Sequence, residues 1–598
     1  MLLSRRQRAA LDAICDTFAP GLDDLPAATE IGVPDEFLAA LERHAAAADR
    51  TPLLRLLSVW NTLGARFSSR AQEEREGVLR SWRDSRIEQR RTAFKVLRKG
   101  TLSHYFGLPA APREAMGYPG PLGLTAVVPP LTGERPDGDC EISCDVVVVG
   151  SGAGGGTAAG VLASAGLDVV VLEAGGSPAV YAEELDALNA LYLDGATTAT
   201  ADQSVDILAG ACLGGGTWVN WTTALPTPDD VRAEWAAHGV PAFTEQEFDD
   251  SLAAVTQRMD VNTEEREPSL RDRALERGLR ELGWHVAAQP RNTRGCDQGR
   301  VCGYCGFGCA LGAKQTTVET WLSDAAARGA RLLVGTRAER VLVERGAAVG
   351  VEAGAGGSRV TVRSRAVVVA CGAIHTPALL RRSGLQNGSI GRNLHLHPVT
   401  LVAGEFDDDT TPWEGSLQAR YSDEHARLDG GYGVRYETPP VHPGLFAAAL
   451  PWASARESLD LALRYRRLVP IFPLLRDRDA GEVVVRRDGR PVVRYRLSRY
   501  DLRHLRAGFV GAARILEAAG AVRVVSTHAT PVVWEPGLGT GVGRFLVEAD
   551  ARGWEPNRVL YASAHLMGTA RMGGSPATSS CDSTGETWEV ARLVVCDG

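Results

Sequence analysis

The sequence predicts an α/β protein with three parts: a Rossmann-like domain, a discontinuous α+β substrate-binding domain, and an all-α domain at the N-terminus. Near the N-terminus apolar side chains recur at helical spacing, as in the segment 53–63. A β-branched run at 145–149 then leads into a glycine-rich turn and an alanine-rich stretch. From about 395 to 540, β-like stretches alternate with helical ones. The 598 residues are enough for two to four domains.

The N-terminal segment predicts helices and no export signal. Arg5 and Arg6 could begin such a signal, but Arg8 and Asp12 interrupt the apolar run that should follow. Ser4 is a suitable N-cap for an amphipathic helix instead. A charged helical stretch from 72 to 91 follows, and a Pro- and Gly-rich strap ends this part at about residue 138. We expect a cytoplasmic protein.

The glycine-rich turn is typical of a dinucleotide site. Gly150 permits a tight turn, Gly152 lets the backbone approach a pyrophosphate, and Gly155 allows close packing of the helix on the strand. Free N–H groups at the start of that helix favour phosphates. Glu173 ends a second strand, 168–172, where a carboxylate can bind ribose hydroxyls. This pattern alone does not separate FAD from NAD.

Later segments predict further strands and one long helix. A β-like stretch at 482–497 has its turn at Asp488-Gly489, and the helix from Arg499 should stop before Gly520. Four shorter strands are predicted earlier, at 331–334, 340–344, 360–363 and 365–370.

Charge and hydropathy argue against a nucleic-acid partner and against a membrane-spanning segment. The net charge of −8 is spread along the chain, and arginines alternate with acidic residues, so no basic face for nucleic acid is expected. No window approaches the ~20 apolar residues that a membrane span needs. We therefore expect neither a nucleic-acid partner nor a transmembrane segment.

Several motifs carry a family resemblance. The segment 210–221 resembles the second flavin-contacting motif of the glucose–methanol–choline (GMC) oxidoreductase family. The segment 565–573 resembles its active-site histidine motif, and 368–377 and 391–398 resemble motifs between the two. The resemblance implies an FAD-dependent enzyme, in which the cofactor contacts Gly214, Gly215, Thr217 and Asn220 as well as the first turn.

Within this family the chain is most similar to the long-chain (fatty) alcohol oxidase branch. The segments 117–121, 220–221 and 302–314 carry that likeness. The helices around Ile14–Pro20 resemble the small subunit of gluconate dehydrogenase. These resemblances imply oxidation of a CH–OH donor, a hydrophobic alcohol such as a long-chain one, to an aldehyde or ketone. Oxygen or an electron carrier would be the acceptor.

By the same resemblance His565 is the base, and a neutral imidazole near pH 7 suits that task. Val219 stands where some family members carry a histidine that attaches FAD covalently, so non-covalent FAD is expected. Asp597 is expected near the flavin. The resemblance also implies a second polar residue beyond Gly598, so we expect the sequence to be a truncated one. Two alternatives stay open: a sugar- or sterol-type dehydrogenase that passes electrons to a carrier, and a catalytically silent flavin-binding protein.

Four cysteines crowd into one loop: Cys296, Cys302, Cys305 and Cys309. Thiolates at such spacing can bind iron or zinc, and the loop is similar to that of iron–sulfur-bearing dehydrogenases of the family. A disulfide is a second possibility. The plainest interpretation, which we favour, is structural thiols. We interpret the pair His395 and His397 as ordinary sheet or loop residues and not as metal ligands.

The walls of the substrate pocket should come from the discontinuous region between the flavin motifs. Four apolar side chains, Trp413, Phe446, Trp452 and Phe472, are candidates for the substrate pocket.

The predicted parts are a helical domain at 1–110, a strap at 111–140, an FAD-binding domain in three parts at 141–225, 326–394 and 546–598, a cap part with the cysteine loop at 226–325, and a substrate-binding domain at 395–545.

Overall fold

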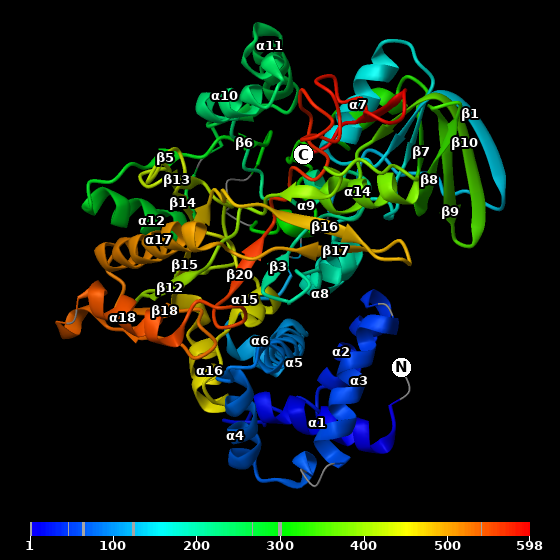
Figure 1. Ribbon diagram of the computed structural model, residues 1–598. Coiled ribbons are helices and arrows are strands. Elements are labelled where there is room, and N and C mark those ends of the chain that lie inside the picture. Colours follow the sequence, from blue (N-terminus) through cyan, green and yellow to red (C-terminus); the bar gives the residue numbers. More distant parts are fainter. Residues whose placement is uncertain are drawn as a thin grey trace.

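The computed structural model describes residues 3–45, 47–62, 66–121, 123, 126–265, 267–296, 302–539 and 541–598. Figure 1 shows a helical N-terminal unit lying against a larger body, in which two sheets lie at opposite ends. Within the described residues, no helix is both long and apolar enough to cross a bilayer.

The N-terminal unit is a small helical bundle. Ser4 caps its first helix, as predicted, by accepting a hydrogen bond from the Gln7 backbone. The predicted charged stretch from 72 to 91 is divided between two helices, because the chain turns at Asp84, whose carboxylate pairs with Arg83. The main helices are α1 (Arg5–Phe18), α2 (Val33–His44), α3 (Ala47–Thr62), α4 (Gln72–Arg83) and α5 (Glu88–Gly107).

The first sheet carries the predicted strand–turn–helix. The β-branched run lies in the centre, with Val148 opposite Val171 on one side and Val368 on the other, so it is buried on both faces. The strand order is β7-β2-β1-β10-β9-β8, and β21 also pairs with β10. The strands are β1 (Cys140–Val149), β2 (Val169–Leu172), β7 (Arg331–Leu333), β8 (Thr336–Glu344), β9 (Ala347–Ala355), β10 (Ser358–Val369) and β21 (Leu593–Val595).

Two strand predictions need correction. The signals at 360–363 and 365–370 belong to the single strand β10, because Ser364 continues the pairing with β1 opposite Cys144. The strand β9 is not predicted from the sequence, and it forms antiparallel pairs with both β8 and β10.

The second sheet belongs to the substrate-binding part of the body. Its core strand β15 is buried along its whole length, and α17 (Arg499–Ala518) packs against it. The helix ends before Gly520, at φ +89°, as predicted. The order is β19 (Val533–Trp534), β18 (Arg523–Ser526), β12 (Val402–Glu405), β15 (Leu468–Leu475), β14 (Val434–Glu437), β13 (Arg420–Ser422) and β5 (Ala287–Ala288).

The predicted hairpin around Asp488-Gly489 lies outside this sheet. It consists of β16 (Gly481–Val485) and β17 (Pro491–Arg494), with Gly489 at φ +80° in the turn. Its partner is β11 (Arg392–Leu394), so the hairpin supports the segment that leads to His397.

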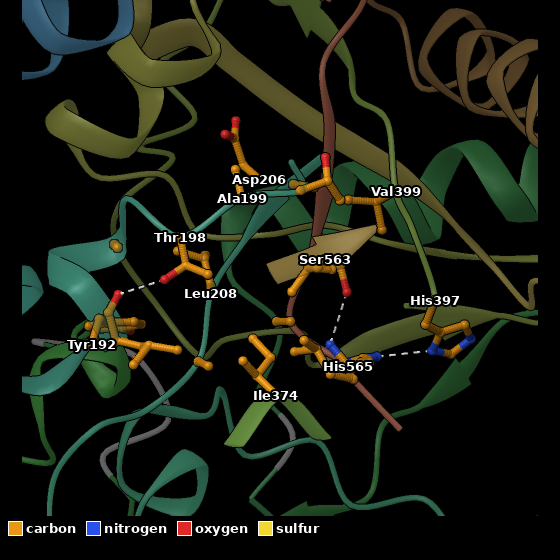
Figure 2. Close-up of a pocket in the computed structure, with 18 of the residues that line it drawn as sticks. Tyr192, Thr198, Ala199, Asp206, Leu208, Ile374, His397, Val399, Ser563 and His565 are labelled. Atoms are coloured by element: carbon orange, nitrogen blue, oxygen red, sulfur yellow. Dashed lines mark hydrogen bonds between the residues drawn. The ribbon is translucent and has the colours of Figure 1, made fainter. Parts of the chain in front are cut away.

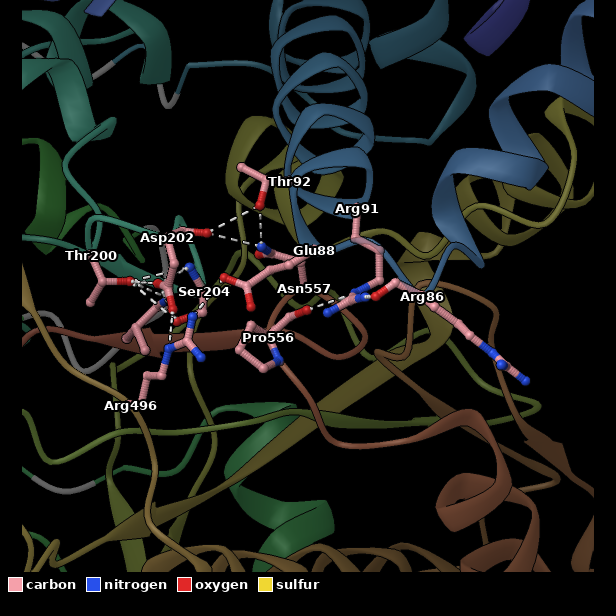
Figure 3. Close-up of polar contacts among 11 residues, drawn as sticks. Arg86, Glu88, Arg91, Thr92, Thr200, Asp202, Ser204, Arg496, Pro556 and Asn557 are labelled. Atoms are coloured by element: carbon pink, nitrogen blue, oxygen red, sulfur yellow. Dashed lines mark hydrogen bonds and ion pairs between the residues drawn. The ribbon is translucent and has the colours of Figure 1, made fainter.

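A short parallel pair of strands connects the helical unit with the histidine motif. β3 (Val205–Ile207) pairs with β20 (Tyr561–Ser563), with Asp206 opposite Ala562. The side chains of Lys95 and Lys99 on α5 both reach Asp206 Oδ1, each at 3.2 Å. Figure 3 shows a neighbouring polar cluster between the same helix and the body, around Asp202.

Candidate cofactor and active site

The turn after β1 has the backbone geometry that the sequence predicts. Gly150 lies at φ +101°, and a Cβ there would clash with the carbonyl oxygen of Ala370. A Cβ at Gly155 would clash with the carbonyl of Gly150, so the helix α7 (Ala153–Ser164) packs tightly on the turn. The Cβ side of Gly152 faces open space. The turn thus leaves its middle residue accessible at the N-terminus of α7.

Glu173 closes this turn from the end of β2. One carboxylate oxygen accepts hydrogen bonds from the Ser151 N–H at 3.2 Å and hydroxyl at 2.5 Å, and the other accepts from the Gly175 N–H at 2.8 Å. Burial raises the pKa of the Glu173 carboxyl. The Ser151 hydroxyl in turn accepts from the Gly214 N–H at 3.0 Å. Glu173 is therefore joined to both glycine motifs.

The second glycine motif lies directly on the first. A Cβ at Gly215 would be 2.9 Å from the Cα of Gly152, and no atom lies near the Cβ side of Gly216. The short helix α9 (Gly216–Val219) follows, and the Thr217 hydroxyl donates to the Gly214 carbonyl at 2.6 Å. The two turns that the sequence separates by about sixty residues thus form one glycine-lined surface.

This surface fits a dinucleotide. Asn220 caps the C-terminal end of α9, and its Oδ1 is buried without a hydrogen-bond partner in the part of the chain that the structure describes. A buried polar atom without a partner is costly, so it indicates a missing ligand group. Together with the open sides of Gly152 and Gly216, it allows FAD to be held between the two turns.

Asp597 lies beside the first turn, next to Gly154. It follows β21, and its carboxylate accepts a hydrogen bond from the Thr376 hydroxyl at 2.5 Å. Burial raises the pKa of this carboxyl. A Cβ at Gly154 would clash with the Cys596 carbonyl, which shows how closely the last strand approaches α7.

The histidine motif brings two imidazoles together. His565 follows β20, and its Nδ1 lies 3.0 Å from Nδ1 of His397. Figure 2 shows the two rings and the contact between them. Burial lowers the pKa of His565, although its ring is open to the cavity. Burial and the neighbouring His565 lower the pKa of His397 to about 3. Both rings are therefore neutral at pH 7.

Asp477 holds His397 in this position. Its carboxylate accepts hydrogen bonds from the backbone N–H groups of Leu396 at 2.9 Å and His397 at 3.0 Å, and from the Tyr495 hydroxyl at 3.0 Å. These bonds support a left-handed backbone at His397, with φ +53°, which is uncommon for a residue with a side chain. The sequence predicts an ordinary sheet or loop residue at His397, and the structure adds a contact that the sequence does not indicate, with a ring 168 positions away.

Both histidines line one large cavity of about 2950 Å³, which also includes Asn220, Trp221 and Phe472. Helices α2 and α5 of the N-terminal unit contribute further walls. The other three aromatic candidates are core residues. Trp452 packs edge-on against Phe18 of α1, Trp413 stacks on Tyr465, and Phe446 packs on the same tyrosine.

The cysteine loop shows no metal centre within the described residues. No group of three histidine, cysteine or carboxylate side chains there is arranged around a common point. Residues 297–301, which connect Cys296 to Cys302, lie outside the described part. Burial raises the pKa of Cys305 far above its usual value, so that thiol keeps its proton. The loop instead contacts α9 through Lys314, whose Nζ donates to the Cys305 and Asn220 carbonyls.

The sheet, the paired glycine turns and the two histidines in one cavity define the class: an α/β protein of the dinucleotide-binding type, with two neighbouring imidazoles in the adjacent cavity. Residues 188–399 and 477–598 match two family models described as GMC oxidoreductase. Residues 5–120 match one described as gluconate 2-dehydrogenase subunit 3. The chain belongs to the GMC oxidoreductase family, whose members bind FAD.

Curated relatives support this assignment. The chain is 37% identical to a long-chain-alcohol oxidase of Arabidopsis thaliana over 482 residues, which cover 76% of this chain and 65% of the relative. It is 36% identical to an uncharacterized GMC-type oxidoreductase of Mycobacterium tuberculosis over 469 residues, which cover 76% and 71%. The chain thus spans somewhat less than two thirds of the length of the plant oxidases that it matches.

The fold is also seen in solved structures. Pyridoxine 4-oxidase from Mesorbium loti is similar with a TM-score of 0.55 and 18% identity, over 76% of this chain and 93% of that chain. At this identity the likeness shows the fold alone.

Proposed function

We propose that this protein is an FAD-dependent oxidoreductase that oxidises a hydrophobic alcohol to an aldehyde or ketone. The contact between His565 and His397 in the cavity, next to the paired glycine turns, carries the proposal. The similarity to long-chain-alcohol oxidases supports the substrate class, and so does Phe472 in the cavity wall. Oxygen or an electron carrier would take up the electrons.

The histidine pair specifies how a proton could leave the alcohol. A 3.0 Å contact between two Nδ1 atoms requires that one ring donates and the other accepts. If His565 donates from Nδ1, its Nε2 carries a lone pair and can accept the hydroxyl proton. His397 can accept that bond because its low pKa keeps it neutral. His397 then fixes the tautomer that base catalysis needs.

The cofactor would be held by Gly152, Gly215, Asn220 and the carboxylate of Glu173, and when bound it would accept the hydride from the carbon of the alcohol. Val219, which is buried in α9, offers no nucleophile for covalent attachment, so we propose non-covalent FAD. Heat or acid should then release the flavin from the polypeptide.

The test is anaerobic stopped-flow reduction of the bound flavin by primary alcohols of increasing chain length. The longer alcohols should reduce and so bleach the flavin of the wild-type protein. His565→Ala should keep its FAD, but its rate of flavin reduction should fall at least ~10²-fold. His285→Ala, a change at an exposed histidine that does not line this cavity, is the matched control.

An unchanged rate in His565→Ala would contradict the proposed base. Reduction by dithionite but by no alcohol would favour a silent flavin-binding protein. Reoxidation by dyes but not by oxygen would identify a dehydrogenase that uses a carrier.

A further inference from the structure

Lysine is rare among the basic residues of this chain. Of the 65 basic side chains other than histidine, only Lys95, Lys99 and Lys314 are lysines, and all the others are arginines. Lys314 is the most deeply buried of them, at 1% exposed. Lysine is among the residues least often fully buried, so its position calls for a specific reason.

Three carbonyl oxygens surround its ammonium group. Lys314 Nζ donates to the carbonyls of Trp218, Asn220 at 3.1 Å, and Cys305 at 2.8 Å. An ammonium has three N–H donors, whereas a neutral amine has two. The three acceptors therefore match the charged form. A planar guanidinium has no compact tripod of donors, which explains why an arginine does not serve here.

The positive charge of Lys314 has no carboxylate partner in the described part of the chain. All its hydrogen bonds go to carbonyl groups, and no carboxylate lies within ion-pair distance. Burial accordingly lowers the pKa of the Lys314 ammonium. Glu319, whose carboxylate accepts a hydrogen bond from Thr316, acts on the ammonium only at longer range. A buried cation whose hydrogen bonds all go to backbone carbonyls favours further negative charge in its surroundings.

The ammonium lies behind the cofactor surface. Two of its three acceptors, Trp218 and Asn220, belong to α9 and its C-cap, and the N-terminal end of α9 lies on the turn at Gly152. Asn220 also lines the cavity that contains His565. The third acceptor, Cys305, belongs to the cysteine loop, so Lys314 attaches that loop to the flavin motif.

We propose that Lys314 is a positioning residue of the cofactor site, whose ammonium holds Asn220 in place and whose positive charge favours the reduced, more negative state of the flavin. The proposal rests on FAD binding, as the proposed function does, but not on the identity of the alcohol. It gives the cysteine loop a structural role that needs no metal.

The test compares Lys314→Met and Lys314→Arg with the wild type. Three properties are measured: the FAD dissociation constant of the apoprotein, the midpoint potential of the bound flavin, and the melting temperature. Lys314→Met should weaken FAD binding at least ~10-fold, the equivalent of about 1.4 kcal/mol, and lower the midpoint potential. Lys314→Arg, which keeps the charge but not the tripod, should weaken binding and preserve more of the potential.

Lys95→Met is the matched control, because it removes a buried lysine that pairs with Asp206 on β3. It should lower the melting temperature and leave the flavin potential unchanged. If Lys314→Met does not fold, Lys314→Gln provides the same neutral comparison. A potential and an FAD affinity unchanged in the neutral variant would overturn the proposal, whatever happens to the melting temperature.

The outcomes separate this proposal from the proposed function. A wild-type protein that binds no FAD would overturn both. Wild-type flavin that no alcohol reduces, combined with a lowered potential in Lys314→Met, would overturn only the proposed function.

Discussion

His397 shows how much one side chain depends on its surroundings. Its backbone is held in a left-handed conformation by Asp477, and its ring meets His565 at 3.0 Å. Because burial and the second imidazole lower its pKa to about 3, the native protein does not protonate it at neutral or mildly acidic pH.

This shift predicts a pH dependence of stability. The unfolded chain binds a proton at His397 below its ordinary pKa of ~6.5, but the folded protein does not until about pH 3. The free energy of unfolding should therefore fall as the pH falls from ~6.5 towards 3. Urea unfolding at several pH values should show a shallower fall in His397→Asn than in the wild type. Equal slopes in both proteins would contradict the lowered pKa of His397.

At the scale of elements, α5 is joined to the strand pair β3–β20, which leads to His565. Lys95 and Lys99 share one carboxylate oxygen of Asp206 in a largely buried position. Burial alone would raise the pKa of Asp206, but the two ammonium groups hold it below its usual range. This contact thus contributes stability above the unfolded pKa of ~3.9, and the contribution is lost as the pH falls below it.

Asp206→Asn would leave both ammonium groups without a countercharge. Breaking one side of a buried ion pair costs about 3–5 kcal/mol, and the partial exposure of Lys99 places the expected loss near the lower end. Chemical unfolding at pH 7 would measure it. Asp23→Asn, which removes an exposed pair with Arg456, should cost much less, because water screens both charges. Similar losses of stability in the two variants would show that burial does not determine the cost of removing the ion pair.

At the scale of the whole molecule, apolar side chains pack the helical unit against the body. Phe18 and Phe94 contact Trp452, with ring centroids 5.1 and 5.8 Å away. The guanidinium of Arg98 donates to the carbonyls of Ala448 and Leu450. The polar cluster in Figure 3 adds contacts from Thr92 and Asn557 to the carbonyl of Asp202.

Because the interface is apolar and hydrogen-bonded, the helical unit and the body should unfold together. Far-UV circular dichroism and tryptophan fluorescence should report one coincident transition in the wild type. Trp452→Ala should destabilise the protein by about 3–5 kcal/mol. Two separate transitions in the wild type would show that the unit is independent.

The sequence by itself determined the elements that rest on local patterns. The run at 145–149, the turn at Gly150 and the cap at Ser4 depend on neighbours a few residues away, and the structure has them where they are predicted. It also determined the family, through motifs that keep their order. The break at Asp84 and the strand β9 were missed because local periodicity does not fix where an element ends.

Only the tertiary structure decided which distant residues meet. His397 and His565, Lys314 and Asn220, and Lys95 and Asp206 are pairs separated by about a hundred residues or more. Their roles depend on burial and on a partner's charge, and neither is a property of a short segment. The first glycine turn identified a dinucleotide surface, and the fold placed the second turn, a buried cation and two neutral imidazoles around it.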